Sequence, residues 1–323
     1  MIVNELSNEP KAMRDAFCAE LIELAERNPD LVVLDADLMG AMGTKPFQKR
    51  FPDRAIDCGI QEANMVGVAA GLSLAGKVPF AHTFGPFMGR RATDQVFISG
   101  AYQGANVKLV GSDPGITAQT NGGTHMPFED MGIMRAIPTM TVIEPTDATM
   151  LQAVMEWMAR TYGMQYMRLV RKTCTKVYEA GTRFEVGKAV TVLDEPGAEV
   201  TIIASGWCVA ETLRAVGLLH DEDVAVRVLD MFTWKPLDEA AVLAAAHDTG
   251  AIVTAENHNV LTGLAAAVSE VVVRNRPVPM EFVGAHDRFG QVGKTDYLAK
   301  QYGMTAADIA EAARRAVARK SAS

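Results

Sequence analysis

The sequence contains few cysteines and no long apolar run. Its 323 residues include four cysteines, and no two of them form a Cys-x-x-Cys pair, which argues against a zinc site or a disulfide framework. No apolar stretch approaches the roughly 20 residues that span a bilayer. Residues 1–10 lack the charged start and apolar core of a secretory signal. We therefore expect buried thiols, a cytoplasmic protein and no membrane partner.

Basic stripes and nucleotide-binding loops are also missing. The net charge is −8 and is spread along the chain, so we expect no nucleic-acid partner. The motif Gly-x-Gly-x-x-Gly does not occur, which leaves a nicotinamide dinucleotide site without support. Residues 290–295, GQVGKT, look like the end of a phosphate-binding P-loop, but the required first glycine falls at Arg288. We therefore do not expect a P-loop.

The residues that are present predict a globular α/β protein. Hydrophobic residues make up 49% of the chain and charged residues 22%, which fits about two domains. Apolar strands alternate with stretches at helical spacing, and such repeats imply parallel sheets with right-handed crossovers. The expected strands are 31–37, 78–83, 107–112, 139–144, 165–170, 199–204, 225–229, 251–255 and 280–283. We expect two domains, 1–175 and 191–323, each with a mostly parallel sheet flanked by helices, joined by a linker at 176–190.

Candidate site residues follow successive expected strands. Glu62 would begin a mostly buried helix, Phe84 and Phe87 follow the second expected strand, and His125 lies in a glycine-rich loop after the third. Taken singly, these residues have ordinary explanations as a helix-capping carboxylate, core aromatics and a loop histidine. Ligands bind open α/β sheets at the carboxyl ends of the strands, however, so the order of these residues favours a ligand site.

This ordered set resembles the pyrimidine-binding domain of the transketolase group of thiamine diphosphate enzymes. Glu62 matches the catalytic glutamate of that family, and Phe84 with Phe87 matches its aminopyrimidine pocket. Residues 123–127, GTHMP, match its Gly-Pro-Thr-His-Gln-Pro loop. Two later segments, 135–138 and 145–147, match the Arg-x-Ile-Pro and Pro-x-Asp sequences that follow in the family.

The resemblance implies a role for each matching residue. Glu62 would hydrogen-bond the pyrimidine ring of thiamine diphosphate, and His125 would hydrogen-bond substrate oxygens and move protons, so both would be catalytic. The implied cofactor-binding residues are Asp37, Glu62, Phe84, Phe87 and Arg90. The implied substrate-binding residues are Arg14, Asn121, His125 and Arg171. Arg168 is a poorer alternative to Arg171, because strand alternation could point either side chain toward the site.

Two positions depart from the family pattern. Asn121 stands where transketolases usually carry an aspartate, and Arg90 stands where they usually carry an aromatic residue. A neutral amide accepts less strongly than a carboxylate from a sugar hydroxyl. Arg90 would either leave the pyrimidine pocket less enclosed or supply a charge to the substrate.

A further family feature has no match in this chain. In the superfamily a Gly-Asp-Gly segment with a downstream Asn, in a preceding domain, holds the diphosphate and its magnesium. We therefore expect the C-terminal subunit of a split transketolase, with no metal site of its own. An N-terminal-section subunit would supply the diphosphate and Mg²⁺ site, and the two would form an α2β2 assembly.

The expected reaction transfers a two-carbon ketol unit from a ketose to an aldose, both small sugars. The enzyme alternatives are the beta subunit of a 2-oxoacid dehydrogenase and a deoxyxylulose-phosphate-synthase-like enzyme. The alternative from a different class is a catalytically silent scaffold subunit that retains the fold.

Overall fold

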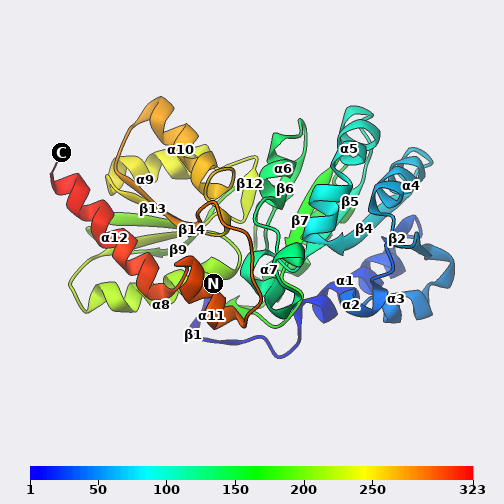
Figure 1. Cartoon of the computed structure of the whole chain (residues 1–323), viewed down its shortest axis with the longest axis horizontal. Helices are drawn as coiled ribbons and strands as arrows, with labels where there is room; N and C mark the ends of the chain where they lie inside the picture. The colour runs from blue at the N-terminus through cyan, green and yellow to red at the C-terminus, as the bar shows by residue number, and fades with distance from the viewer. Residues whose placement is uncertain (323) are drawn as a thin grey trace.

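Two sheets with their helices make up the chain in the computed structural model, which describes residues 1–322. Figure 1 shows them as two lobes side by side, one coloured blue to green and the other green to red. A separate two-stranded ribbon joins β1 (Ile2–Asn8) to β8 (Thr175–Tyr178) in antiparallel pairing. Among residues 1–322, no helix is both long and apolar enough to cross a membrane.

The first sheet contains seven strands among the described residues, in the order β12-β6-β7-β5-β4-β2-β3. Their bounds are β2 (Leu31–Asp35), β3 (Ala55–Asp57), β4 (Val78–Phe84), β5 (Lys108–Ser112), β6 (Thr141–Ile143), β7 (Gln165–Leu169) and β12 (Thr233–Lys235). Strands β2 to β7 run parallel, and β12 is antiparallel to β6. All five residues of β2 are buried, as expected when helices cover both faces of a parallel sheet.

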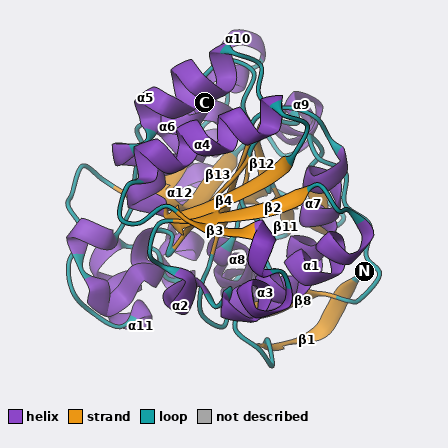
Figure 2. Cartoon of the chain, turned by 90° about the vertical axis from the view of Figure 1, so that its right-hand side faces the viewer, coloured by secondary structure: helices purple, strands orange, loops and turns teal. Residues whose placement is uncertain are grey.

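Helices cover both faces of this sheet. The longer ones are α1 (Met13–Arg27), α4 (Glu62–Leu74) and α7 (Ala148–Arg160), and the shorter ones are α2 (Met39–Met42), α3 (Lys45–Arg50), α5 (Thr93–Gln95) and α6 (Asp130–Ala136). Figure 2 shows α4 on one side of β2 and β4 and α1 with α3 on the other. The apolar residues of α1 and α7 pack in one core cluster, and those of α4 pack in another.

The second sheet has five strands among the described residues, in the order β14-β13-β10-β11-β9. Their bounds are β9 (Val190–Asp194), β10 (Val200–Ala204), β11 (Val226–Asp230), β13 (Ile252–Asn259) and β14 (Met280–Ala285). Only β9 in this set pairs antiparallel. The helices are α8 (Trp207–His220), α9 (Glu239–Asp248), α10 (Leu264–Asn275), α11 (Thr295–Tyr302) and α12 (Ala306–Ser321). The expected α/β class with two mostly parallel sheets is thus confirmed.

Several elements differ from the sequence-based expectation. Strands β1, β8, β9 and β12 were not expected; β8 lies partly within the expected linker, and β12 leaves the second half of the chain to join the first sheet. The spacing of apolar residues over 88–102 predicts a helix, but the structure has two π-helical segments, Phe87–Arg91 and Val96–Tyr102, on either side of α5. Such wide turns change which side chains share a helix face, and they recur at functional sites.

The second lobe supports one loop of the first. A small apolar cluster joins Ile116, Met126 and Phe128 to Leu298 and Tyr302 around α11. Gly123 has to be glycine, because a Cβ there would clash with the carbonyl oxygen of Gly290. The glycine-rich loop that carries His125 is therefore held in place from the second lobe.

Candidate active site

The candidate site lies at the carboxyl edge of the first sheet. Strands β2, β4 and β5 run parallel and in register, so the loops that follow them leave from the same edge. Three non-glycine residues in these loops have left-handed backbone conformations: Asp37 (φ 61°), Asp113 (φ 60°) and Gln119 (φ 54°). Such strained residues cluster at ligand sites, where the surrounding structure holds them in place.

Glu62 begins α4 at this edge. The Asp57 carboxylate accepts hydrogen bonds from the backbone N–H groups of Asp37 and Gly59, which fixes the turn that leads from β3 into the helix. Glu62 is 2% exposed, and Nη1 of Arg91 donates to both of its carboxylate oxygens, at 3.0 and 3.1 Å. The Arg91 side chain itself is 49% exposed. A buried carboxylate thus has one charged partner on its open side.

Three rings lie next to this ion pair. The ring centroid of His125 lies 5.2 Å from that of Phe87 and 6.0 Å from that of Phe84, and the two phenylalanine centroids are 5.9 Å apart. The guanidinium carbon of Arg91 lies 4.1 Å from the centre of the Phe87 ring, within cation–π range. Arg91 therefore connects the buried carboxylate to the aromatic cluster formed by Phe84, Phe87 and His125.

A group of charged side chains borders the aromatic cluster on another side. The guanidinium carbon of Arg171 lies 5.2 Å from the centre of the Phe84 ring, and its Nε donates to both oxygens of the fully buried Asp113, at 3.0 and 2.9 Å. Burial raises the pKa of the Asp113 carboxyl, and Arg171, Lys172 and His125 each oppose that shift. Asn121 donates to the same carboxylate at 3.3 Å.

Arg14 reaches this group from α1. Its Nη1 donates to the carbonyl oxygen of Ala41 at 3.0 Å, and Nη1 of Arg171 donates to the same oxygen at 3.5 Å. The structure thus brings together seven of the residues implied by the resemblance, which form a connected set of contacts through Arg91, Asp113 and Ala41. The seven are Arg14, Glu62, Phe84, Phe87, Asn121, His125 and Arg171.

Two other expected residues lie differently. Asp37 is exposed beyond the end of β2, at the same sheet edge, and its backbone rather than its carboxylate makes the hydrogen bond to Asp57. Arg90 donates through Nε to Glu129 at 2.5 Å and through Nη1 to the carbonyl oxygen of Thr124 at 3.5 Å. Arg90 therefore faces α6 and the histidine loop, whereas Arg91 faces Glu62.

Arg168 does not belong to this set. It is fully buried and lies between the two lobes, where it pairs with Asp130 at 3.2 Å and Glu144 at 3.0 Å. It also donates to the carbonyl oxygens of Pro127 and Asn257, both at 2.9 Å. Its five donors are largely used by the protein, so its role is to join the lobes.

Sequence reasoning missed Arg91 and Asp113. Arg91 follows Arg90, and in a regular helix residues three and four after Phe87 both lie near that ring. The π-helical turn selects Arg91, and no sequence pattern considered above indicates that turn. Asp113 lies one residue beyond β5, a position at which an acidic residue can be read as a loop cap.

The arrangement fits the aminopyrimidine of thiamine diphosphate. A flat heteroaromatic ring needs apolar faces around it and a hydrogen-bonding group at its edge. The phenylalanine rings supply the apolar faces, and the buried Glu62 carboxylate is linked to them through the half-exposed Arg91. The residues at this edge can thus bind a planar ring, hold a proton at a carboxyl, and bind an anion at the arginines.

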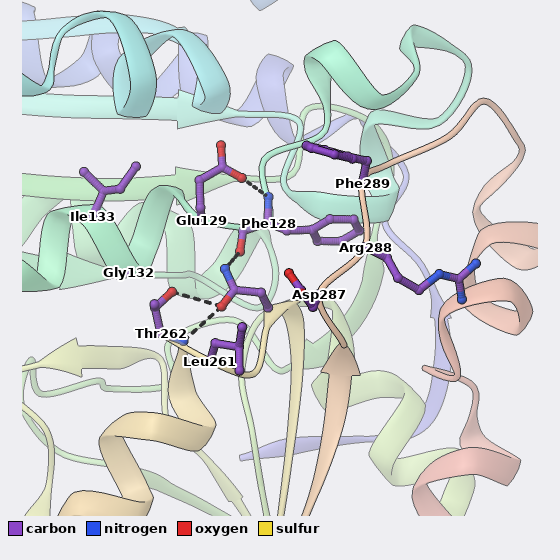
Figure 3. A pocket seen from close by; sticks show the side chains of 10 residues that line it. Phe128, Glu129, Gly132, Ile133, Leu261, Thr262, Asp287, Arg288 and Phe289 are labelled. Atoms are coloured by element: carbon purple, nitrogen blue, oxygen red, sulfur yellow. Dashed lines mark hydrogen bonds between the residues drawn. The ribbon is translucent and has the colours of Figure 1, made fainter.

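A separate pocket of about 410 Å³ lies between α6 and the loop after β14. Figure 3 shows Ile133 and Glu129 at the left of the pocket, Leu261 with Thr262 below, and Arg288 with Phe289 at the right. Its nearest link to the site is Glu129, which pairs with Arg90. The pocket therefore adjoins the candidate site without containing Glu62 or the aromatic cluster.

Comparison with known proteins assigns the fold to a family. A family model for the transketolase pyrimidine binding domain matches residues 9–176, and one for the transketolase C-terminal domain matches residues 187–309. The chain belongs to the transketolase family. Its relatives include the 6-deoxy-6-sulfo-D-fructose transketolase subunit SqwH of Clostridium sp. (strain MSTE9), which is 48% identical over 316 residues and covers 98% of each chain.

Other transketolases are similar over different shares of their length. One of the subunits of the apulose-4-phosphate transketolase of Phocaeicola vulgatus is 33% identical over 95% of this chain and 98% of its own. Human transketolase is 35% identical, with 94% of this chain matching 48% of the human protein. A solved split gene transketolase, described as an inactive beta4 tetramer, superposes with a TM-score of 0.88 at 39% identity, over 97% of this chain and 100% of that one. This chain thus has the extent of a split transketolase subunit.

Proposed function

We propose that this chain is the C-terminal subunit of a split transketolase that uses thiamine diphosphate at an interface with a second subunit. The enzyme moves a two-carbon ketol unit from a ketose, which becomes an aldose two carbons shorter, to an acceptor aldose, which becomes a ketose two carbons longer. The observation that carries this proposal is the buried Glu62 carboxylate beside the cluster of Phe84, Phe87 and His125.

The roles of the side chains follow from their positions. When bound, thiamine diphosphate supplies a carbon nucleophile for the ketose carbonyl. Glu62 would hold a proton at the edge of the pyrimidine ring, where its low-dielectric surroundings strengthen that hydrogen bond. Phe84 and Phe87 would hold the ring faces and exclude water. His125 would hydrogen-bond the substrate's reacting oxygens and move protons to and from them.

The arginines indicate the class of substrate. Arg14 and Arg171 converge on one carbonyl oxygen beside the aromatic cluster, so they would bind an acidic group at the far end of the sugar. One relative is described as acting on a sulfonated fructose and another on apulose 4-phosphate. We propose a ketose donor with a terminal acidic group, and Asn121 as a further contact to the sugar.

The partner and the assembly belong to the proposal as well. The second subunit would carry the diphosphate-binding domain and hold Mg²⁺, and two copies of each subunit would form an α2β2 enzyme. The inactive state described for the split-gene beta4 tetramer agrees with a requirement for the partner. Residues 1–175 would form the pyrimidine-binding domain and 191–323 the C-terminal domain, with Asp37 and Arg90 near the cofactor.

Product analysis with the assembled subunits tests this function. We expect ketol transfer from an acid-tailed ketose to an aldose, with both products detected by mass spectrometry. The variant Glu62→Ala should lose turnover at least about a hundredfold, the scale of a positioned proton-transfer group, while still binding the partner. Decarboxylation of pyruvate in place of ketol transfer would favour the 2-oxoacid dehydrogenase or deoxyxylulose-phosphate-synthase alternatives. Unchanged activity in Glu62→Ala would refute the catalytic assignment.

A further inference from the structure

The anion-binding part of the site carries a carboxylate of its own. We define the acid subsite as Arg14, Arg171 and Lys172 with the carboxylates that touch them. Arg171 is 14% exposed, and its Nε is bonded to both oxygens of Asp113, which is fully buried. Beside the face of Phe84, Nη2 of Arg171 then remains as a donor for a ligand, while Nη1 makes the long contact of 3.5 Å to the carbonyl oxygen of Ala41.

The other two cations of the acid subsite differ in their partners. Arg14 lies 3.7 Å from the carboxylate of Asp15, and both side chains are partly exposed. Lys172 donates to the side-chain oxygen of Gln119 at 2.5 Å and therefore has a neutral partner there. Three cations and two carboxylates leave a net charge of about +1 in the acid subsite at neutral pH.

We propose that Asp113 makes the acid subsite selective for a singly charged sulfonate over a more highly charged phosphate, an inference that rests on the proposed ketol transfer. A sulfonate carries one negative charge, whereas a phosphate monoester carries about −1.5 to −2 at pH 7. A subsite with net charge +1 neutralises a sulfonate. With a phosphate bound, the same subsite would carry an excess of negative charge. The buried Asp113 carboxylate repels that excess across a poorly solvated environment.

The conformation of Asp113 makes a clean test feasible. Its φ of 60° lies in the left-handed region, which asparagine adopts more readily than most residues. The substitution Asp113→Asn has nearly the same shape, keeps an oxygen that accepts from Arg171 Nε, and removes one negative charge. The matched control is Asp30→Asn, which removes the same charge from an exposed pair with Lys77 just before β2, at the opposite edge of the sheet.

The experiment measures donor selectivity in the complex assembled with the partner subunit. We would compare kcat/KM for 6-deoxy-6-sulfofructose and for fructose 6-phosphate, with one aldose acceptor, and report the phosphate-to-sulfonate ratio, since a general loss of activity cancels in it. The wild type should have a ratio below one. Asp113→Asn should raise that ratio about tenfold or more, as expected when one charge roughly 7 Å from the ligand is removed at an effective dielectric of about 20. Asp30→Asn should leave it unchanged.

The outcomes separate this inference from the proposed function. A complex that transfers no ketol unit from any ketose overturns the proposed function and this inference with it. Ketol transfer with a wild-type ratio above one, or with a ratio that Asp113→Asn does not raise, overturns the selectivity role of Asp113 and leaves the proposed function standing. An equal rise in Asp30→Asn would also overturn it, because overall charge rather than the acid subsite would then set the preference.

Discussion

Arg168 and Arg171 lie three residues apart, at and just beyond the end of β7, and each pairs with a fully buried aspartate, yet their surroundings differ. Arg168 is enclosed, since two carboxylates and the carbonyl oxygen of Pro127 in the first lobe, with that of Asn257 in the second, take up its donors. Nε of Arg171 donates to the Asp113 carboxylate, and its Nη1 makes a longer contact of 3.5 Å to the carbonyl oxygen of Ala41. The same residue type is thus enclosed by protein partners in one place, and in the other it keeps donors on a partly exposed side, where we propose that an anion binds.

The comparison of Arg168 with Arg171 shows which property distinguishes a structural arginine from a candidate ligand-binding one. Burial and ion pairing are common to both arginines, so neither is diagnostic. What distinguishes them is whether donors remain on a side where a ligand can enter. Arg91 follows the pattern of Arg171, because it pairs with a buried carboxylate and is itself half exposed.

Removing Arg168 should have the largest effect. Arg168→Met leaves Asp130 and Glu144 buried without their cation, and burial already raises the pKa of the Glu144 carboxyl, which Arg168 opposes. We expect the free energy of unfolding to fall by about 3 kcal/mol or more, as is typical when one partner of a buried ion pair is removed. Urea unfolding measures it, with Arg160→Met at the exposed end of α7 as control. Equal stability of the two variants would contradict the structural role.

His82 is a second buried titratable group, and it should make the stability of the protein depend on pH. His82 on β4 is fully buried 3.1 Å from Asp35, and burial lowers its pKa to about 3 while burial raises the pKa of Asp35 to about 7. Unfolded His82 takes up a proton near pH 6.5 and folded His82 does not, so this residue makes stability fall as the pH drops from about 6.5 toward 3.

The variant His82→Gln should lose that contribution. Between pH 6.5 and pH 5 the wild type should lose about 1.6 kcal/mol more stability than the variant, because the loss approaches 1.36 kcal/mol per pH unit only once the unfolded histidine is fully protonated. Asp35 acts in the opposite direction, because burial raises its folded-state pKa. Unfolding curves at the two pH values measure the difference, and parallel pH dependences would show that His82 is protonated in the folded state.

Removing Arg171 should change catalysis more than folding. Arg171→Met should lower kcat/KM for an acid-tailed ketose about tenfold, mainly through KM, because a charge-assisted hydrogen bond to the substrate is lost. Its free energy of unfolding should fall less than in Arg168→Met, since the side chain is partly exposed. Arg171→Lys should recover part of the KM effect, since it keeps the charge and loses the planar fork. A variant as unstable as Arg168→Met with an unchanged KM would remove the distinction between the two arginines.

The smallest effect concerns Arg91 and Arg90. Arg91→Met should slow ketol transfer about fivefold, below the range for a group that itself transfers a proton, because Arg91 acts by orienting Glu62 and packing on Phe87. Stability should fall, because the buried Glu62 carboxylate loses its cation, but by less than in Arg168→Met, since the Arg91 side chain is half exposed. Arg90→Met is the matched comparison, because it removes the neighbouring arginine. A larger loss in Arg90→Met would favour the sequence-based assignment of Arg90 to the cofactor site.

The sequence predicted the fold where local pattern and tertiary structure agree. The apolar run at 31–37 is strand β2, with Asp37 beyond its end, and Glu62 begins α4 as expected. Short edge strands such as β12 lack such a pattern, since three residues carry no clear period and their pairing with β6 is set by tertiary contact. The π-helical turns Phe87–Arg91 and Val96–Tyr102 were not predicted either, because no sequence pattern considered above indicates them.

The site was predicted by residue type and order rather than by contact. Strand alternation left Arg168 and Arg171 undecided, because the choice depends on where the second lobe packs. Asp113 and Arg91 were recognised as site residues only from their contacts in the structure. Asp113 pairs with Arg171, and Arg91 pairs with Glu62. Ion pairs between residues so far apart in the chain leave no local signal in a single sequence.

A crystal structure of this chain with its partner subunit, thiamine diphosphate and Mg²⁺ tests the central claim most directly. We predict that a Glu62 carboxyl oxygen lies within about 2.6–3.2 Å of a pyrimidine ring nitrogen, the range of a catalytic hydrogen bond, with Phe84 and Phe87 flanking the ring. A pyrimidine bound elsewhere, with Glu62 still paired only with Arg91, would contradict the account.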